Sequence, residues 1–145
     1  MAIEIIKDKD TEYRIDDEKG HVMILWHDNE TNATYMAETQ CHSDDMQHYS
    51  RRFGMELAEH RLMMQLGRSF LANTLYQNLK NLKHLLQTCM QGKNSCSHEV
   101  ILINRAIMRA EEEIHKNKEF LKKMKQDERD MIISYAKRTS AIGQK

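Results

Sequence analysis

Proline is absent from this chain of 145 residues, and only five glycines are present. Because proline is the residue that most firmly ends a helix, nothing forces a stop in the helical pattern that follows position 45. The few glycines form no phosphate-binding loop and no Gly-x-Ser-x-Gly nucleophile turn. No apolar run approaches the length that crosses a bilayer. With no catalytic pattern in view, we expect a protein that is not an enzyme and needs no cofactor.

Cysteine is scarce as well, with Cys41, Cys89 and Cys96 as its three examples. An odd number without framework spacing is typical of reduced thiols in a reducing compartment. Cys89 and Cys96 flank an expected turn, so a bridge between them stays open as an alternative. The first residues include Glu4 and no long apolar core, so we expect no secretory signal and a cytoplasmic location.

The net charge is zero, yet the charges are separated along the chain. Residues 1–45 carry 12 acidic and 4 basic side chains, whereas residues 46–145 carry 10 acidic and 18 basic ones. The formal charges of the two parts are therefore −8 and +8. This separation favours either docking of the acidic part on the basic part, within one chain or between two, or capture of an anionic ligand by the basic part.

Residues 1–43 show alternating and β-branched stretches divided by turn clusters. The alternation predicts a meander of three or four antiparallel strands, and Gly20 is placed to take a positive φ in one of the turns. A sheet of this size must cover one face with helix to be stable. The expected strands are Ala2–Ile6, Thr11–Ile15, Val22–Trp26 and Ala33–Gln40.

Residues 44–91 have the pattern of one helix, roughly 70 Å long at 1.5 Å per residue. Ser43 or Asp44 is the expected N-cap, and Gly92 is the expected end of the helix. Gly67 is the one weak place, where we expect a kink if the helix bends at all. The apolar stripe comprises Tyr49, Phe53, Leu57, Met64, Leu71, Leu75, Leu79, Leu82, Leu86 and Cys89.

Residues 98–138 repeat apolar positions at alternating spacings of three and four, which is the pattern of a coiled-coil seam. Ser95 or Ser97 is the expected N-cap, and the residues after Lys137 are expected to fray. Asn117 and Glu128 interrupt the seam, which comprises Val100, Ile103, Ile107, Ala110, Ile114, Asn117, Leu121, Met124, Glu128, Met131 and Tyr135.

A short turn between two long helices makes them antiparallel neighbours. The sequence therefore predicts a single domain of the α+β class: a small N-terminal antiparallel β-sheet followed by a long, coiled-coil-like two-helix hairpin. Two helices bury one seam, yet further apolar side chains lie beside the main stripe of the first helix. That surplus requires a partner, either the sheet or another copy of the chain, and we therefore expect a homo-oligomer, at least a dimer. The side chains concerned are Met55, Met63, Leu85 and Met90.

Metal-ligand residue types occur at two spacings. Glu112-x-x-His115 has the spacing of di-iron bundles, but the seam places both side chains on the outer face, where bundle ligands do not lie. His42, Asp45 and His48 stand three apart at a helix start, where Asp45 also serves as a first-turn acid. We expect no resident metal. A metal-dependent hydrolase centred on these three residues stays open as one functional alternative.

Anion binding has more support from the residues. Between positions 51 and 109 the chain has 9 Lys or Arg residues and 3 acidic ones. Arg105 and Arg109 are four apart, so they lie side by side outside the seam and could grip a pair of phosphates bidentately. Hairpin pairing places Asn78 and Asn81 roughly alongside them, where the amides could bind ribose hydroxyls or a base edge. Tyr76 is the nearest aromatic side chain for stacking.

A purely structural interpretation competes with this one. Arg109 can pair with Glu112 or Glu113 on its own helix, Arg105 can be solvated, and surface ion pairs of this kind contribute little to stability. A small anion suits the chain better than a long nucleic acid, because the acidic N-terminal part would repel a phosphate backbone.

The junction between the two parts carries a family resemblance. Residues 37–45 end in Cys-His-Ser-Asp-Asp and lead into a helix with Gly54-x-x-Leu57-Ala58-x-x-Arg61. This combination resembles a module of small phage proteins, in which a strand ends in Cys-His-Pro-Asp-Asp before a helix with Gly-x-x-Leu-Ala-x-x-Arg. Ser43 stands where that module usually has proline. With the plan of a small sheet, this junction and two helices, the chain resembles the phage Thoeris anti-defence sponge family.

The resemblance implies a non-enzymatic protein that binds cyclic ADP-ribose isomers, or cyclic oligonucleotides, and keeps them from the immune effector of a bacterial host. Its location would be the host cytoplasm if the chain is phage-encoded. The resemblance also implies phosphate contacts from helix arginines, two of them one turn apart on the last helix. Arg105 and Arg109 match that spacing, and Arg61 belongs to the shared module.

The sequence thus predicts sequestration of a cyclic nucleotide immune signal without turnover, by a homo-oligomer and with no membrane partner. The runner-up is a coiled-coil interaction module that inhibits or bridges a host protein, for which an exposed apolar stripe left after oligomerisation would be the sign. The predicted ligand-binding residues are Arg61, Tyr76, Asn78, Asn81, Arg105 and Arg109.

Overall fold

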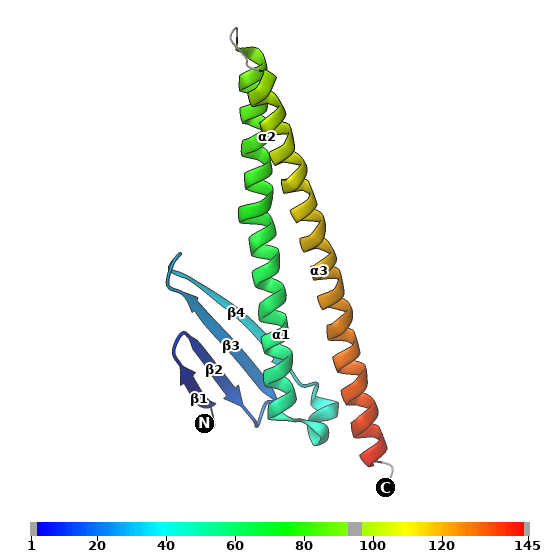
Figure 1. Ribbon diagram of the computed structural model, residues 1–145. Coiled ribbons are helices and arrows are strands. Elements are labelled where there is room, and N and C mark those ends of the chain that lie inside the picture. The colour runs from blue at the N-terminus through cyan, green and yellow to red at the C-terminus, as the bar shows by residue number, and fades with distance from the viewer. Residues whose placement is uncertain (1–2, 93–96, 144–145) are drawn as a thin grey trace. The chain divides into compact units, whose positions relative to one another are not determined.

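A computed structural model describes residues 3–92 and 97–143 of the chain (Figure 1). The chain divides into two compact units. The first, which we call the sheet unit, comprises Met1–Leu66 and Met124–Lys145, and the second, the helical unit, comprises Gly67–Lys123. The expected cap at Ser95 and the alternative bridge to Cys96 lie outside the described residues.

The N-terminal part is a sheet of four antiparallel strands in the order β1-β2-β3-β4 (Figure 1). The predicted meander and the α+β class are confirmed, and the β4 bounds agree with those expected. The other three strands run one to three residues further than the alternation indicated. The strands are β1 (Ile3–Asp8), β2 (Thr11–Asp16), β3 (His21–Asp28) and β4 (Ala33–Gln40).

Gly20 sits in the turn between β2 and β3 with φ +66, as predicted. A Cβ atom at this position would lie 2.6 Å from Met46 Sδ and 2.8 Å from Cys41 Cβ. The Gly20 carbonyl also accepts a 2.8 Å hydrogen bond from the Cys41 N–H group. Glycine is therefore required twice here, once by the backbone conformation and once by the close approach of the junction.

The inner face of the sheet packs against α1 (Arg51–Phe70), which gives this small sheet the helical cover that it needs. Alternate residues along the strands supply this face because side chains of a strand point to opposite sides in turn. The buried members of this core are Ile15, Val22, Ile24, Ala37, Ala58 and Leu62, with Tyr13, Trp26, Tyr35, Met55 and Leu66 packed around them.

The Gly54-x-x-Leu57-Ala58-x-x-Arg61 module has a packing explanation. Gly54 marks the closest approach of α1 to the sheet, since a Cβ there would lie 2.8 Å from Val22 Cγ2. The Thr39 hydroxyl donates a buried 3.2 Å hydrogen bond to the Gly54 carbonyl. Ala58, one turn later, is fully buried, so two small residues on one helix face let the helix lie close to the strands.

The helix start differs from the expectation of Ser43 or Asp44 as N-cap. Residues Ser43–His48 form a 3₁₀ helix, η1, whose cap is His42: the ring Nδ1 accepts a 3.3 Å hydrogen bond from the Asp44 N–H group. The α-helix begins only at Arg51. Ser50 precedes it, and its hydroxyl accepts a 3.2 Å hydrogen bond from the Phe53 N–H group, as an N-cap does.

The irregularity in the long helix lies after Gly67, and not at it. Leu71–Leu75 form a π-helical turn, η2, in which the Tyr76 N–H group bonds to the Leu71 carbonyl. The apolar stripe has two successive spacings of four here, from Leu71 to Leu75 to Leu79, where the seam pattern alternates three and four. A π-helical turn accommodates one extra residue, so it keeps all three leucines on one face.

The helix then continues as α2 (Tyr76–Gln91) and ends at Gln91, as predicted. Gly92 caps it in an extended conformation, with φ −73 and ψ 138, and not in the left-handed one typical of such glycines. All ten residues of the predicted stripe are buried or half-buried, which confirms the pattern.

The last helix, α3 (Ser97–Gly143), is longer than the expected 98–138 and is helical where fraying was expected. The Tyr135 hydroxyl donates to the His48 carbonyl, and its ring stacks on Phe53 with centroids 4.1 Å apart. These contacts hold the C-terminal part of the helix in the sheet unit. Every residue of the predicted seam from Val100 to Tyr135 is buried or half-buried, so the heptad pattern is confirmed.

Within the helical unit, Gly67 is a point of close contact with α3. The Asn117 side-chain amide donates a 3.1 Å hydrogen bond to the Gly67 carbonyl. A Cβ on Gly67 would lie 2.8 Å from Leu121 Cδ2. Asn117 thus interrupts the apolar seam to satisfy a carbonyl on the neighbouring helical segment. In the described part of the chain, no helix is long and apolar enough to span a membrane.

Part of the charge separation along the chain is balanced by ion pairs inside the sheet unit. Arg51 at the start of α1 forms ion pairs with Glu4 of β1, at 2.6 Å, and with Asp17 of the β2–β3 turn. Hydrogen bonds from Arg51 and from the Tyr49 hydroxyl hold the pKa of the Asp17 carboxyl below its usual value. Docking of acidic strands on a basic helix start therefore accounts for part of the separation, as one of the two expected explanations requires.

Candidate functional site

Arg105 and Arg109 lie one turn apart on α3, in the helical unit, and both side chains are exposed. Among the described residues neither has a hydrogen-bond or ion-pair partner. The structural interpretation pairs Arg109 with Glu112 or Glu113. Glu112 pairs instead with Lys116 at 3.4 Å, and Glu113 has no ion pair among the described residues. Ten donor N–H groups on two guanidinium groups are thus available to a ligand at one helix face.

Asn78, Asn81 and Tyr76 lie on α2 in the same unit, and all three are exposed. The Asn81 carbonyl oxygen accepts a 3.1 Å hydrogen bond from the Gln77 amide on its own helix. Lys118 of α3 lies over the Tyr76 ring, with Nζ 5.5 Å from the centroid. Five of the six predicted ligand-binding residues therefore belong to one unit, and Tyr76 already has a cation on its ring.

Arg61, the sixth predicted residue, belongs to the sheet unit and has structural partners there. Its Nε donates to Glu128 Oε1 of α3 at 3.0 Å, and its Nη1 donates to the Glu38 carbonyl of β4 at 3.0 Å. The side chain thus ties the edge of the sheet to the C-terminal part of α3. Glu128 interrupts the apolar seam because it is the partner of this arginine.

A cavity of about 480 Å³ in the sheet unit, which we call the junction cavity, lies between the junction, the first turns of α1 and the last turns of α3. Small-molecule sites commonly have volumes of about 300–1,000 Å³, so this cavity is large enough for a nucleotide. Arg61 is on its wall, together with the rings of Tyr49, Phe53 and Tyr135. Further polar side chains on the wall are Thr39, Gln40, His42, Asp45, Gln47, His48, Ser50 and Thr139.

The cavity wall shows no activated nucleophile. Burial, with a smaller contribution from Asp45, raises the pKa of the Cys41 thiol above its ordinary value of 9.0. The thiol is therefore protonated at neutral pH and unsuited to nucleophilic attack. The Arg61 guanidinium keeps three N–H donors beyond its two described bonds, but Glu128 offsets its charge. This wall suits hydrogen bonding and ring contact more than the capture of two phosphates.

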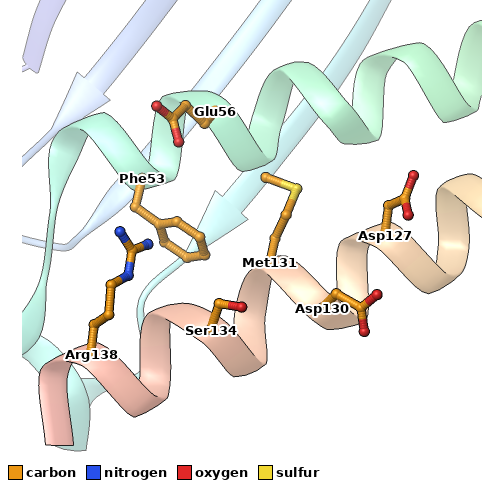
Figure 2. Close-up of a pocket in the computed structure, with 7 residues that line it drawn as sticks. All are labelled: Phe53, Glu56, Asp127, Asp130, Met131, Ser134 and Arg138. Atoms are coloured by element: carbon orange, nitrogen blue, oxygen red, sulfur yellow. The ribbon is translucent and has the colours of Figure 1, made fainter. Parts of the chain in front are cut away.

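A second hollow of the sheet unit, of about 380 Å³, lies between α1 and α3 and is drawn in Figure 2. The Phe53 ring points from α1 toward α3, and Arg138 lies near one end. Glu56, Asp127 and Asp130 contribute three carboxylates to its wall, so it repels phosphate groups. Of the two hollows, the junction cavity is therefore the better place for an anionic ligand.

The described residues contain no cluster of side chains that supports either metal-site alternative. Among the described residues, no group of three or more His, Cys, Asp or Glu side chains is arranged to hold a metal ion. His42 instead caps η1, and His48 is 3.2 Å from the Gln47 amide. Glu112 and His115 are both exposed, on the outer side of the seam as predicted.

Comparisons with protein-family models, with curated proteins and with solved structures gave no match to this chain.

Sequence reasoning did not identify the groups that build the junction cavity. The heptad pattern places Tyr135 in the seam, and the helix pattern places Ser50 inside the first helix. Both residues also contribute to the cavity wall. One signal was present in the sequence: Glu128 is a charge at a seam position, which a seam tolerates only when a partner such as Arg61 faces it.

Proposed function

We propose that this protein binds a small cyclic nucleotide immune signal, a cyclic ADP-ribose isomer or a cyclic oligonucleotide, and sequesters it without turnover. The observation that carries the proposal is the pair Arg105 and Arg109, exposed, one turn apart and without partners among the described residues. A planar guanidinium group donates two parallel hydrogen bonds to a phosphate, so adjacent arginines match a ligand with two phosphates.

The proposed binding surface requires the two helices of the helical unit to form an antiparallel hairpin. Two contacts support that arrangement: Gly67 meets Asn117 and Leu121, and Tyr76 meets Lys118. Continuing this pairing along both helices in opposite directions brings the arginine pair level with the α2 turns that contain Asn78 and Asn81. The amides would then bind the ribose hydroxyls or the base edge.

Tight capture also requires exclusion of water, because exposed charge pairs in water contribute little. We propose that a second protomer supplies the enclosure, so that the ligand lies between protomers. The helical unit has the apolar side chains that such an assembly would cover. Those with 40% or more of their surface exposed are Phe70, Tyr76, Leu85, Met90, Ile101, Leu102, Met108 and Phe120.

Capture without chemistry is part of the proposal. It is supported by the protonated Cys41 thiol, which is unsuited to nucleophilic attack. A sponge needs a slow release rate more than any catalytic group, and a pre-formed, enclosed site provides that. The proposed ligand class comes from the resemblance of the junction to the anti-defence sponge family, and under the proposal the arginine pair would provide the phosphate contacts.

The test is thermal melting of the protein with a panel of cyclic ADP-ribose isomers and cyclic di- and trinucleotides. A ligand at 100 to 1,000 times its Kd stabilises the native state by about 3–4 kcal/mol, which shifts the melting temperature measurably. We expect a shift with one ligand, and its loss in the double variant Arg105→Glu/Arg109→Glu.

Lys122→Glu/Lys125→Glu is the matched control, because it makes the same change of charge at two exposed positions of the same helix. Under the proposal this control keeps the ligand-induced shift. A shift lost equally in both double variants would mean that net charge, and not the arginine pair, determines binding. No shift with any ligand would remove the proposal.

A coiled-coil interaction module that inhibits or bridges a host protein is the second candidate. The exposed apolar side chains of the helical unit favour it, provided that they remain exposed in the assembled protein. Arg105→Glu/Arg109→Glu would then leave the activity largely unchanged, whereas a charge at Met108, which is 69% exposed, would abolish it.

A further inference from the structure

The outer edge of the sheet at β1 has no partner among the described residues. β1 pairs with β2 on one side only, and all six of its residues are exposed. Ile3, Ile5 and Ile6 are 53%, 60% and 37% exposed, so the edge is also apolar. Open apolar edges pair readily with another strand, and natural proteins usually cover or charge them.

The other edge of the same sheet, at β4, has two contacts with α1 near the end of the strand. Arg61 donates a hydrogen bond to the Glu38 carbonyl of β4, and the Thr39 side chain of the same strand bonds to α1. Within the described part of the chain, β1 has no comparable contact along its free side. Its one described ion pair, from Glu4 to Arg51, comes from a side chain on the inner face and leaves the backbone edge open.

The hairpin loop determines which backbone groups of β1 point outward. Asp8 and Thr11 are partners on either side of a two-residue turn, so they form the hydrogen-bonded pair that closes it. Bonded and non-bonded pairs alternate in an antiparallel ladder, which makes Ile6–Tyr13 and Glu4–Ile15 the next bonded pairs. The N–H and C=O groups of Ile3, Ile5 and Lys7 therefore point to the free edge.

We propose that β1 pairs antiparallel with β1 of a second copy of this chain, about a twofold axis at Ile5, to make one continuous sheet of two chains. Ile5 then faces Ile5 of the partner subunit, and Ile3 faces Lys7 of the partner subunit. All three outward residues of each chain form bonded pairs. The sheet gains six backbone hydrogen bonds, two for each of three such pairs.

Charge selects this register from its neighbours. A shift that centres the axis on Glu4 places that carboxylate opposite its own copy, and a shift that centres it on Ile6 places Glu4 opposite Asp8 of the partner subunit. Like charges directly opposite one another are destabilising, and each of these shifts also loses one bonded pair. In the Ile5 register Glu4 faces an isoleucine, so it keeps its ion pair with Arg51. The inference does not depend on the proposed ligand.

Cross-linking tests the register directly. The Cα atoms of a bonded antiparallel pair lie about 5.5 Å apart, within the range that a disulfide spans. We expect Ile5→Cys to form a covalent dimer under mild oxidation, with peptide mapping showing position 5 joined to position 5. Met36→Cys is the control, because Met36 is 43% exposed in β4 of the same sheet. Equal cross-linking of both variants, or none at position 5, would overturn the proposal.

The second arm is the mass of the assembly in solution. Ile5→Lys places two ammonium groups against each other at the axis, so we expect the mass to fall to half that of the natural protein. Met36→Lys should leave the mass unchanged. Circular dichroism keeps the result interpretable, because an exposed edge substitution should preserve the folded spectrum. A natural protein that is monomeric, or an Ile5→Lys variant with the full mass, would contradict the pairing.

Discussion

Gly54→Ala tests how closely α1 packs on the sheet. Glycine inside a helix costs about 1 kcal/mol relative to alanine, so the substitution would stabilise a helix that had space for the methyl group. Here the new Cβ would lie 2.8 Å from Val22 Cγ2 and 3.5 Å from Thr39 Oγ1. Val22 is fully buried in β3, and its branched side chain has little freedom to move away.

The two contributions have opposite signs. Overpacking a filled core costs about 1–3 kcal/mol, against the gain of about 1 kcal/mol in helix propensity. We therefore expect Gly54→Ala to lower the free energy of unfolding by about 1 kcal/mol, measured by urea denaturation followed by circular dichroism.

A double-mutant cycle isolates the contact. Val22→Ala removes the Cγ2 methyl group that the new Cβ would meet, so Gly54→Ala should raise the free energy of unfolding when it is made in the Val22→Ala background. The coupling between the two positions is then favourable and on the order of 1–2 kcal/mol.

Gly67→Ala is the matched control, because that Cβ would meet Leu121 Cδ2, the mobile end of a half-buried side chain. We expect it to be neutral or stabilising. If Gly54→Ala proved as stabilising as Gly67→Ala, with no coupling to Val22, the close approach of α1 to β3 would be refuted.

Three further outcomes follow from the sheet unit. Ser50→Ala should cost about 1 kcal/mol of stability in urea denaturation by removing the N-cap of α1, whereas Ser43→Ala should cost far less. The reverse order would show that Ser50 is not the N-cap of α1. Because Arg51 holds the pKa of Asp17 below its usual 3.8, the contribution of the Arg51–Asp17 ion pair to stability is present at neutral pH. That contribution is lost as the pH falls below about 4. Asp17→Asn should therefore flatten the acid side of a melting-temperature profile, and an unchanged profile would contradict the pairing. Tyr135→Phe should cost about 1 kcal/mol by removing the bond to the His48 carbonyl, and no loss of stability would show that this bond does not form.

Periodicity predicted the fold class and the buried faces of the elements because it follows the pattern of burial directly. The alternation around Val22 predicts a strand with one buried face, and the seam from Val100 to Tyr135 is buried or half-buried at every position. Gly20 was predictable because few residues other than glycine accept both its φ and its contact with Met46. These features depend on residue type and spacing alone.

The position of the α1 N-cap and the place of the helix irregularity could not be predicted, because several neighbouring residues were equally suitable. Ser43, Asp44 and Ser50 all have capping side chains, and only the three-dimensional course of the junction selects Ser50 for α1. The π-helical turn was signalled by the spacing from Leu71 to Leu79, but Gly67 was the more familiar weak point. Gly67 stays helical, and its carbonyl accepts a hydrogen bond from the Asn117 side chain of α3.

The candidate site was predictable only in part. The spacing of Arg105 and Arg109 predicts that they lie side by side on one helix, and the structure finds both side chains exposed. Arg61 has partners on β4 and on a distant part of α3, which no local pattern reveals. The junction cavity is likewise built from segments far apart in the sequence, so its wall could not be assembled from motifs.

The most direct test of the central claim is recovery of the captured ligand. The protein is incubated with the cyclic nucleotide that shifts its melting, separated from free ligand, denatured, and the released compound is identified by mass spectrometry. The account predicts that the ligand is retained and returned chemically unchanged, and that Arg105→Glu/Arg109→Glu retains none. Release of a hydrolysed product, or no retention of any ligand, would contradict sequestration by this protein.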